Sequence, residues 1–87
     1  MKTRLLRRLR RKAKKVYRIK YHKPYYRVTE KGYTGSKMYY DGKDYVRSDR
    51  NSIQDAISLI IKLRRLWILN ELIKFKVNKA NKQLRKL

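Results

Sequence analysis

The residues of this chain that are most able to do chemistry are its lysines and arginines, and they are concentrated near the N-terminus. Residues 1–15 carry nine basic side chains, and the first acidic residue is Glu30. Such a density of cations is suited to neutralising phosphates, with counterion release as the source of affinity. The predicted phosphate-binding residues of this segment are Arg4, Arg7, Arg8, Arg10, Arg11, Lys12, Lys14 and Lys15. A solvated charged surface without a ligand is the alternative.

The tyrosines are a second candidate for binding chemistry, because all eight lie between residues 17 and 45, interleaved with Lys and Arg. A sheet that carries aromatic and basic side chains together suits single-stranded nucleic acid: bases stack on the rings while cations contact the phosphates. The predicted phosphate contacts on the strands are Arg18, Lys20 and Arg27, and the predicted stacking residues are Tyr25, Tyr33 and Tyr40.

Tyrosine is also a favoured strand residue, so some of these rings must belong to the core. The alternation of residues 16–22 and 25–30 places one set of side chains on a single face. The core residues predicted from this alternation are Tyr17, Ile19, Tyr21, Tyr26 and Val28.

Catalysis is a competing hypothesis that depends on His22, the only histidine. A histidine among Arg and Tyr residues can act as a general acid–base group, as in small basic ribonuclease toxins. Asp41, Asp44 and Asp49 are close enough in sequence to suggest a magnesium site, but a turn explains Asp41 and the approach to a helix explains Asp49. We therefore predict a protein that is not an enzyme and has no metal or cofactor.

The net charge of +21 on 87 residues limits the choice of partner. Self-repulsion of this size destabilises an isolated protein, and a polyanion compensates for it. Nucleic acid, DNA or RNA, is the first candidate, an anionic membrane the second and an acidic protein the third. Residues 5–16 and 59–75 are basic and amphipathic, as interfacial helices are. A patterned sheet needs their apolar faces, however, so a membrane partner is not favoured.

The sequence also bears on location. The basic start is not followed by the apolar run of a signal peptide. Lys62, Arg64 and Arg65 interrupt the longest apolar stretch, which is too short and too charged to span a bilayer. The predicted location is the cytoplasm or a virion, and the protein is expected to be neither secreted nor transmembrane.

The order of predicted elements is a basic helix, antiparallel strands and a long helix, in a single domain of residues 1–87. Residues 1–15 carry a narrow leucine stripe and form either a helix that docks on the rest or an unstructured arm. Residues 16–47 form an antiparallel meander of three or four strands, at 16–22, 25–30, 38–40 and 43–47. Asp41-Gly42 between the last two predicts a tight hairpin turn.

The helix predicted over residues 52–87 contains most of the residues that demand burial. Ser52 is a good N-cap, and no Gly or Pro follows it. The first half presents a broad apolar arc, which is expected to cover one face of the sheet; Arg64 projects into this arc. The arc comprises Ala56, Ile57, Leu59, Ile60, Ile61, Leu63, Leu66, Trp67 and Ile68.

The apolar side of this helix shifts near Asn70, after which Leu69, Ile73, Val77, Ala80 and Leu84 recur close to a heptad seam. Two interpretations remain open. In one, the helix is continuous and its second half packs on the N-terminal helix or on a second copy, giving a homodimer. In the other, a kink or break near Asn70 lets both halves fold onto one core.

These elements define an α+β fold with a long amphipathic helix over one face of the strands. The helix–strands–helix order is similar to that of double-stranded-RNA-binding domains, and strands followed by one covering helix are similar to the arm domains of some integrases. The basic cluster that begins the last helix in the first family is replaced here by Ser52-Ile53-Gln54-Asp55.

The stretch MKTRLLRRLRRKAKKVYRIKY, residues 1–21, resembles in composition the openings of small basic accessory proteins of microvirus-type single-stranded-DNA phages. This resemblance implies a virus-encoded protein that condenses or packages its genome. It assigns no role to an individual residue. The sequence thus predicts a largely sequence-nonspecific nucleic-acid-binding protein, with a ribonuclease toxin or a dimeric assembly protein as alternatives.

Overall fold

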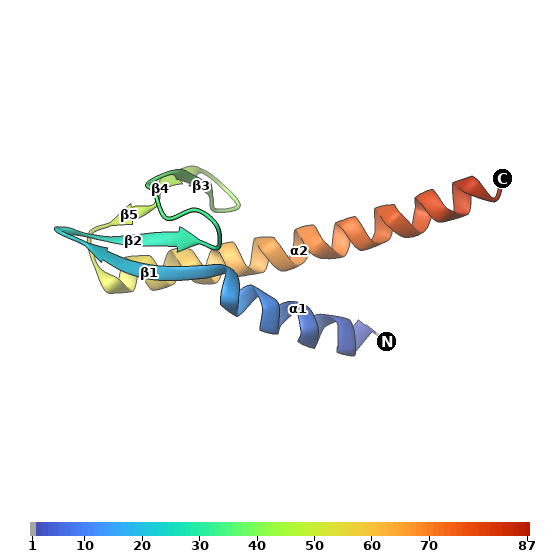
Figure 1. Ribbon diagram of the computed structural model, residues 1–87, viewed down its shortest axis with the longest axis horizontal. Helices are drawn as coiled ribbons and strands as arrows, with labels where there is room; N and C mark the ends of the chain where they lie inside the picture. The colour runs from blue at the N-terminus through green and yellow to red at the C-terminus, as the bar shows by residue number, and fades with distance from the viewer. Residues whose placement is uncertain (1) are drawn as a thin grey trace.

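The computed structural model describes residues 2–87, so the first residue of the predicted N-terminal helix lies outside it. The predicted α+β order is confirmed: a helix, antiparallel strands and a long second helix (Figure 1). The elements are α1 (Lys2–Val16), β1 (Tyr17–His22), β2 (Tyr25–Glu30), β3 (Met38–Tyr40), β4 (Tyr45–Arg47), β5 (Asp49–Arg50) and α2 (Ile53–Arg85).

α1 is the helix that the leucine stripe predicts. Leu9 and Ala13, one turn apart, are buried, and Leu5 and Leu6 are half-buried on the same side. The charged remainder of the helix faces solvent, which is the pattern of an amphipathic surface helix. α1 passes into β1 without a loop, since Val16 ends the helix and Tyr17 begins the strand.

β1, β2 and β5 form a three-stranded antiparallel sheet in that order. The register of β1 and β2 runs from Tyr17 opposite Glu30 to His22 opposite Tyr25. β5 was not predicted, because a two-residue strand has no periodicity of its own. The third strand of this sheet therefore follows the hairpin in the chain, and the strands do not form one consecutive meander.

β3 and β4 form a separate two-stranded ribbon. Ser48, which is fully buried, joins this ribbon to the sheet. Its Oγ accepts a hydrogen bond from Lys37 N at 2.9 Å, its N–H donates to Lys37 O, and its carbonyl accepts from Val28 N at 2.8 Å. Because all of these polar groups are satisfied, a buried serine is tolerated at this position.

The turn between β3 and β4 differs from the predicted two-residue turn. Tyr40 pairs with Tyr45, so the loop has four residues and β4 begins at Tyr45. Asp41 Oδ1 accepts hydrogen bonds from Lys43 N at 2.9 Å and Asp44 N at 2.8 Å, while Gly42 has φ +104°, a region that favours glycine. Asp41 therefore shapes this loop as an Asx turn.

The first half of α2 covers one face of the sheet, as predicted (Figure 1). Ser52 caps the helix, since its Oγ accepts a hydrogen bond from Asp55 N at 3.1 Å. The buried residues of the core are Tyr17, Val28, Tyr39, Ala56, Leu59, Ile60 and Leu63, with Val16, Tyr26, Val46 and Trp67 packed against them.

The predicted core was too wide in two places. Tyr21 is 59% exposed, and Ile19 is exposed as well, so their assignment to the core was wrong. Ile57 and Ile61 of the predicted arc are also exposed and line a groove with Ile19 along β1. The physical reason is that β1 is an edge strand with one long side open to solvent, and only Tyr17 at its start joins the buried core.

α2 is a single uninterrupted helix, so the alternative of a break near Asn70 is wrong. Its second half extends beyond the sheet, and the molecule measures 56 × 24 × 23 Å as a result (Figure 1). α1 lies beside α2 and runs in the opposite direction, and the two helices diverge toward the N-terminus of α1 and the C-terminus of α2.

Candidate nucleic-acid interface

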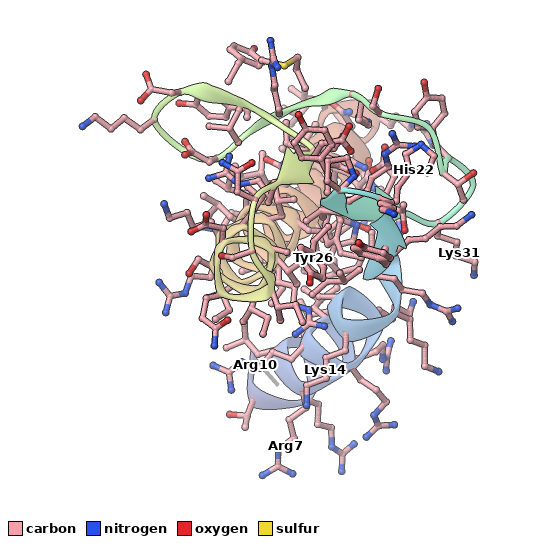
Figure 2. All side chains as sticks on the ribbon, turned by 90° about the vertical axis from the view of Figure 1, so that its left-hand side faces the viewer. Arg7, Arg10, Lys14, His22, Tyr26 and Lys31 are labelled. Atoms are coloured by element: carbon pink, nitrogen blue, oxygen red, sulfur yellow. The ribbon has the colours of Figure 1, made fainter. Side chains whose placement is uncertain are left out.

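The outward surface of α1 gathers the cations that the sequence singled out. All eight predicted phosphate-binding residues between positions 4 and 15 are exposed. Figure 2 shows Arg7 projecting from α1 away from the rest of the molecule. Among residues 2–87, the ion pairs of the structure involve Arg27, Lys37 and Lys74, so none of the eight is neutralised by a carboxylate. We refer to this surface, residues 4–15 of α1, as the basic face.

The spacing of these charges resembles that of a nucleic acid. Arg4 and Lys15 are eleven residues apart, so the eight cations occupy about 16 Å of helix at 1.5 Å per residue. This is about one positive charge per 2 Å, close to the one negative charge per about 1.7 Å of duplex DNA. Arg7, Arg11 and Lys14 lie at intervals of four and three and share one line along the helix.

Two kinds of contact hold α1 on the rest of the protein. Leu9 and Ala13 are buried, and Arg64 of α2 donates from Nη2 to the carbonyl of Lys14 at 3.5 Å. That carbonyl lies in the last turn of α1, where helix carbonyls lack intrahelical donors and a cation is favourable. Arg64 thus contacts α1 rather than solvent, in agreement with its predicted place in the apolar arc.

The cationic series continues from α1 onto β1. Arg18 and Lys20 are exposed, and Arg18 is only three residues beyond Lys15 with no loop between them. The register pairs Arg18 with Thr29 and Lys20 with Arg27, so these side chains share the face of the sheet opposite the core. Both β1 cations are therefore positioned to extend the basic face.

Arg27 differs from the other predicted phosphate contacts. Its Nε donates to Asp49 Oδ1 at 2.6 Å and its Nη2 to Asp49 Oδ2 at 3.2 Å, a bidentate pair. The hydrogen bond from Arg27 holds the pKa of the Asp49 carboxyl below its usual range. The charge of Arg27 is therefore compensated within the protein, and we leave it out of the interface.

Tyr25, Tyr33 and Tyr40 are exposed, as their assignment to stacking requires. The structure adds two exposed rings that alternation did not single out, Tyr21 and Tyr45, of which Tyr45 is the more open at 71%. An exposed tyrosine at a hairpin end has no periodic partner, so the sequence offered no signal for Tyr45.

The exposed rings do not form one stacking platform. Tyr40 lies beside Tyr45 on the β3–β4 ribbon, with ring centroids 5.3 Å apart, and its hydroxyl donates to Gly42 O. Tyr33 belongs to the loop after β2. Tyr25 alone shares the outer sheet face with Arg18 and Lys20, since it pairs with His22 in the β1–β2 register. Tyr25 is consequently the best placed of the three predicted stacking residues.

The groups considered for catalysis and metal binding have other surroundings. His22 is exposed at the outer end of β1. It lines neither the groove along β1 nor the groove between α1 and α2. Hydrogen bonds from the backbone of Asp44 and Lys43 hold the pKa of Asp41 below its usual range. Within residues 2–87 no group of three His, Cys, Asp or Glu side chains could hold a metal ion.

A groove of about 590 Å³ lies between the N-terminal half of α1 and the C-terminal half of α2. Its apolar lining comprises Leu5, Leu6, Leu69, Leu72, Ile73 and Phe75. Four basic residues, Arg4, Arg8, Lys76 and Lys79, also border it. Arg4 and Arg8 therefore border this groove as well as belonging to the basic face.

No protein-family model matches the chain, and neither the curated proteins nor the solved structures contain a match to it. Over residues 2–87, neither helix is long and apolar enough to cross a lipid bilayer.

Proposed function

We propose that this protein binds nucleic acid largely without regard to sequence, through phosphate neutralisation by the basic face of α1. The observation that supports this proposal is the set of eight exposed cations on one helix with no acidic residue among them. A helix that served only solubility would gain little from this density, since like charges at neighbouring positions destabilise it. A bound phosphate backbone removes that repulsion.

The expected affinity comes mainly from charge, because phosphate contacts fix position and do not read sequence. Arg18 and Lys20 of β1 extend the contact surface, and Tyr25 supplies a ring on which a base of a single strand can stack. Arg27, which is paired with Asp49, does not contribute a free charge.

The test is fluorescence anisotropy with labelled single-stranded DNA, duplex DNA and RNA of equal length, at several salt concentrations. We expect binding that is similar for unrelated sequences, with a logarithmic salt slope of about −3.5 on single strands and −4.5 on duplex if five phosphates are neutralised. No binding to any of the three at low salt would overturn the proposal.

Two further assays address the ribonuclease alternative and the viral genome. Gel analysis of the RNA after incubation detects cleavage, and His22→Ala would abolish it if the protein were a ribonuclease. The resemblance of residues 1–21 to microvirus accessory proteins adds a viral genome to the proposal. Circular single-stranded phage DNA is the probe for that part, with compaction of the circle in electron micrographs as the expected result.

A further inference from the structure

The C-terminal part of α2 carries an apolar stripe that nothing in the described chain covers. The buried core positions Ala56, Leu59 and Leu63 recur at intervals of three and four, and the half-buried Leu66 continues this spacing. Counted in heptads rather than around an ideal helical wheel, the same spacing continues beyond the sheet, through the polar Asn70 to Ile73, Val77, Ala80 and Leu84. From Ile73 onward every residue of α2 is exposed. We refer to the five residues from Asn70 to Leu84 as the C-terminal stripe.

We propose that a second copy of this chain covers the C-terminal stripe, with the two α2 helices antiparallel. The heptad spacing of the stripe is that of a coiled coil, in which such positions contact a facing helix. This inference goes beyond nucleic-acid binding and does not depend on it.

A partner would stabilise the helix at this place. Residues 73–85 carry five Lys and Arg residues and no acidic residue, and three pairs of these cations are three residues apart. Like charges at this spacing oppose helix formation, and isolated helices shorter than about 12–15 residues are marginal in water. Burial of Ile73, Val77 and Leu84 against another apolar stripe supplies the missing stabilisation.

The charges beside the stripe permit a second copy in a definite register. When Val77 lies opposite the second copy's Ala80, Ile73 lies opposite its Leu84. In this register, the positions that flank the seam on one side bring Lys74 next to Asn81 of the second copy. Those on the other side bring Lys76 next to Gln83 of the second copy. Each lysine therefore faces a neutral amide, and no pair of like charges flanks the contact.

The position of the sheet decides the orientation. In a parallel pair the two sheets would lie beside each other at the same end of the contact. The N-terminal half of each α2, at Ala56, Leu59 and Leu63, is already covered by the sheet of its own chain. Figure 1 shows that the C-terminal half of α2 extends beyond the sheet of its own chain. In an antiparallel pair only these free halves would overlap, and the two sheets would lie at opposite ends. This arrangement has a two-fold axis and is closed.

The groove between α1 and α2 adjoins the proposed contact. Ile73 belongs both to the stripe and to the groove lining, and Leu69 lies beside it. A helix placed along the stripe would therefore shield one side of the groove as well. The resulting contact of two α2 helices and two flanking α1 helices resembles a four-helix bundle.

The first test is the molar mass by light scattering without nucleic acid, at 0.5 M salt, where charges more than about 5 Å apart are screened. We expect twice the 10.7 kDa of one chain at high protein concentration. Val77→Glu should give 10.7 kDa with the sheet and the first half of α2 still folded, because Val77 contacts no part of the core. Asn78→Glu, with the same charge change on the neighbouring outward position, should leave the dimer intact.

Cross-linking tests the orientation, since the chain has no cysteine of its own. In the antiparallel register the two copies of residue 84 are offset by eleven residues, or about 16 Å, too far for a disulfide. Leu84→Cys alone should therefore not cross-link, whereas a mixture of Ile73→Cys and Leu84→Cys proteins should. Self-linked Leu84→Cys would overturn the antiparallel arrangement. A mass of 10.7 kDa for the parent protein would overturn the dimer while leaving nucleic-acid binding untouched.

Discussion

Replacement of Arg7 and Arg11 by alanine tests the basic face most directly. Both side chains are exposed, both lie on one line along α1, and neither has a carboxylate partner. The double variant removes two cations without disturbing Leu9 or Ala13, which hold α1 on the protein. Alanine also preserves the helix, since it has the highest helix propensity.

The expected loss follows from counterion release. Each phosphate contact contributes about 0.7 to the logarithmic salt slope on single strands and about 0.9 on duplex. Two lost contacts should therefore flatten the slope by about 1.4 on single strands and 1.8 on duplex. At 0.1 M salt this corresponds to a decrease in affinity of about 25-fold on single strands and 60-fold on duplex, similar for all sequences.

The assay is anisotropy titration between 50 and 300 mM salt, with circular dichroism to verify the helix content. The matched control is Arg47→Ala with Arg85→Ala, which lowers the net charge equally but lies on β4 and at the end of α2. We expect the control to bind within about three-fold of the parent, since charges more than about 10 Å away are screened at 0.1 M salt. Equal losses in both double variants would refute a localised interface and leave only the attraction of the whole net charge.

Three further predictions concern single residues. Tyr25→Ala should weaken single-stranded binding about 5- to 160-fold and leave duplex binding nearly unchanged, because a stacked base contributes about 1–3 kcal/mol; Tyr45→Ala, measured by the same titration, should have little effect on either. Ser52→Ala should lower the free energy of unfolding in urea by about 1 kcal/mol through loss of the α2 N-cap, whereas Ser58→Ala, exposed on the same helix, should change it by less than about 0.5 kcal/mol. Because Arg27 holds the pKa of Asp49 below its unfolded value, the stabilisation that Asp49 provides is present above about pH 4 and is lost as pH falls through the folded pKa. The urea midpoint of the parent should therefore fall between pH 6 and pH 3 more steeply than that of Asp49→Asn, and parallel curves would contradict this.

The elements that local sequence determines were predictable. α2 begins one residue after Ser52, and β1 and β2 lie within about a residue of their alternating patterns. The basic face was visible as well, since a leucine stripe in a cationic segment implies that the charges lie on the outside. Periodicity carried this information because it reflects which side of an element is buried.

The remaining features depend on tertiary contacts that no local pattern encodes. β5 exists only because β2 offers it an edge, and Ser48 is buried only because two elements converge on its polar groups. Tyr21 alternates in phase with Tyr17 but lies near the hairpin end of the edge strand β1, where it is exposed. Similarly, the compensation of Arg27 by Asp49 joins residues 22 positions apart and could not be inferred from composition.

The direct passage from α1 into β1 has a consequence for how binding proceeds. With no linker between Val16 and Tyr17, the cationic helix cannot swing or refold on its own when it meets a ligand. The surface is thus pre-organised, and association incurs little ordering entropy in the backbone. Calorimetry should then give a heat-capacity change far smaller than that of coupled folding and binding, and the association rate should depend on electrostatic steering rather than on a conformational step.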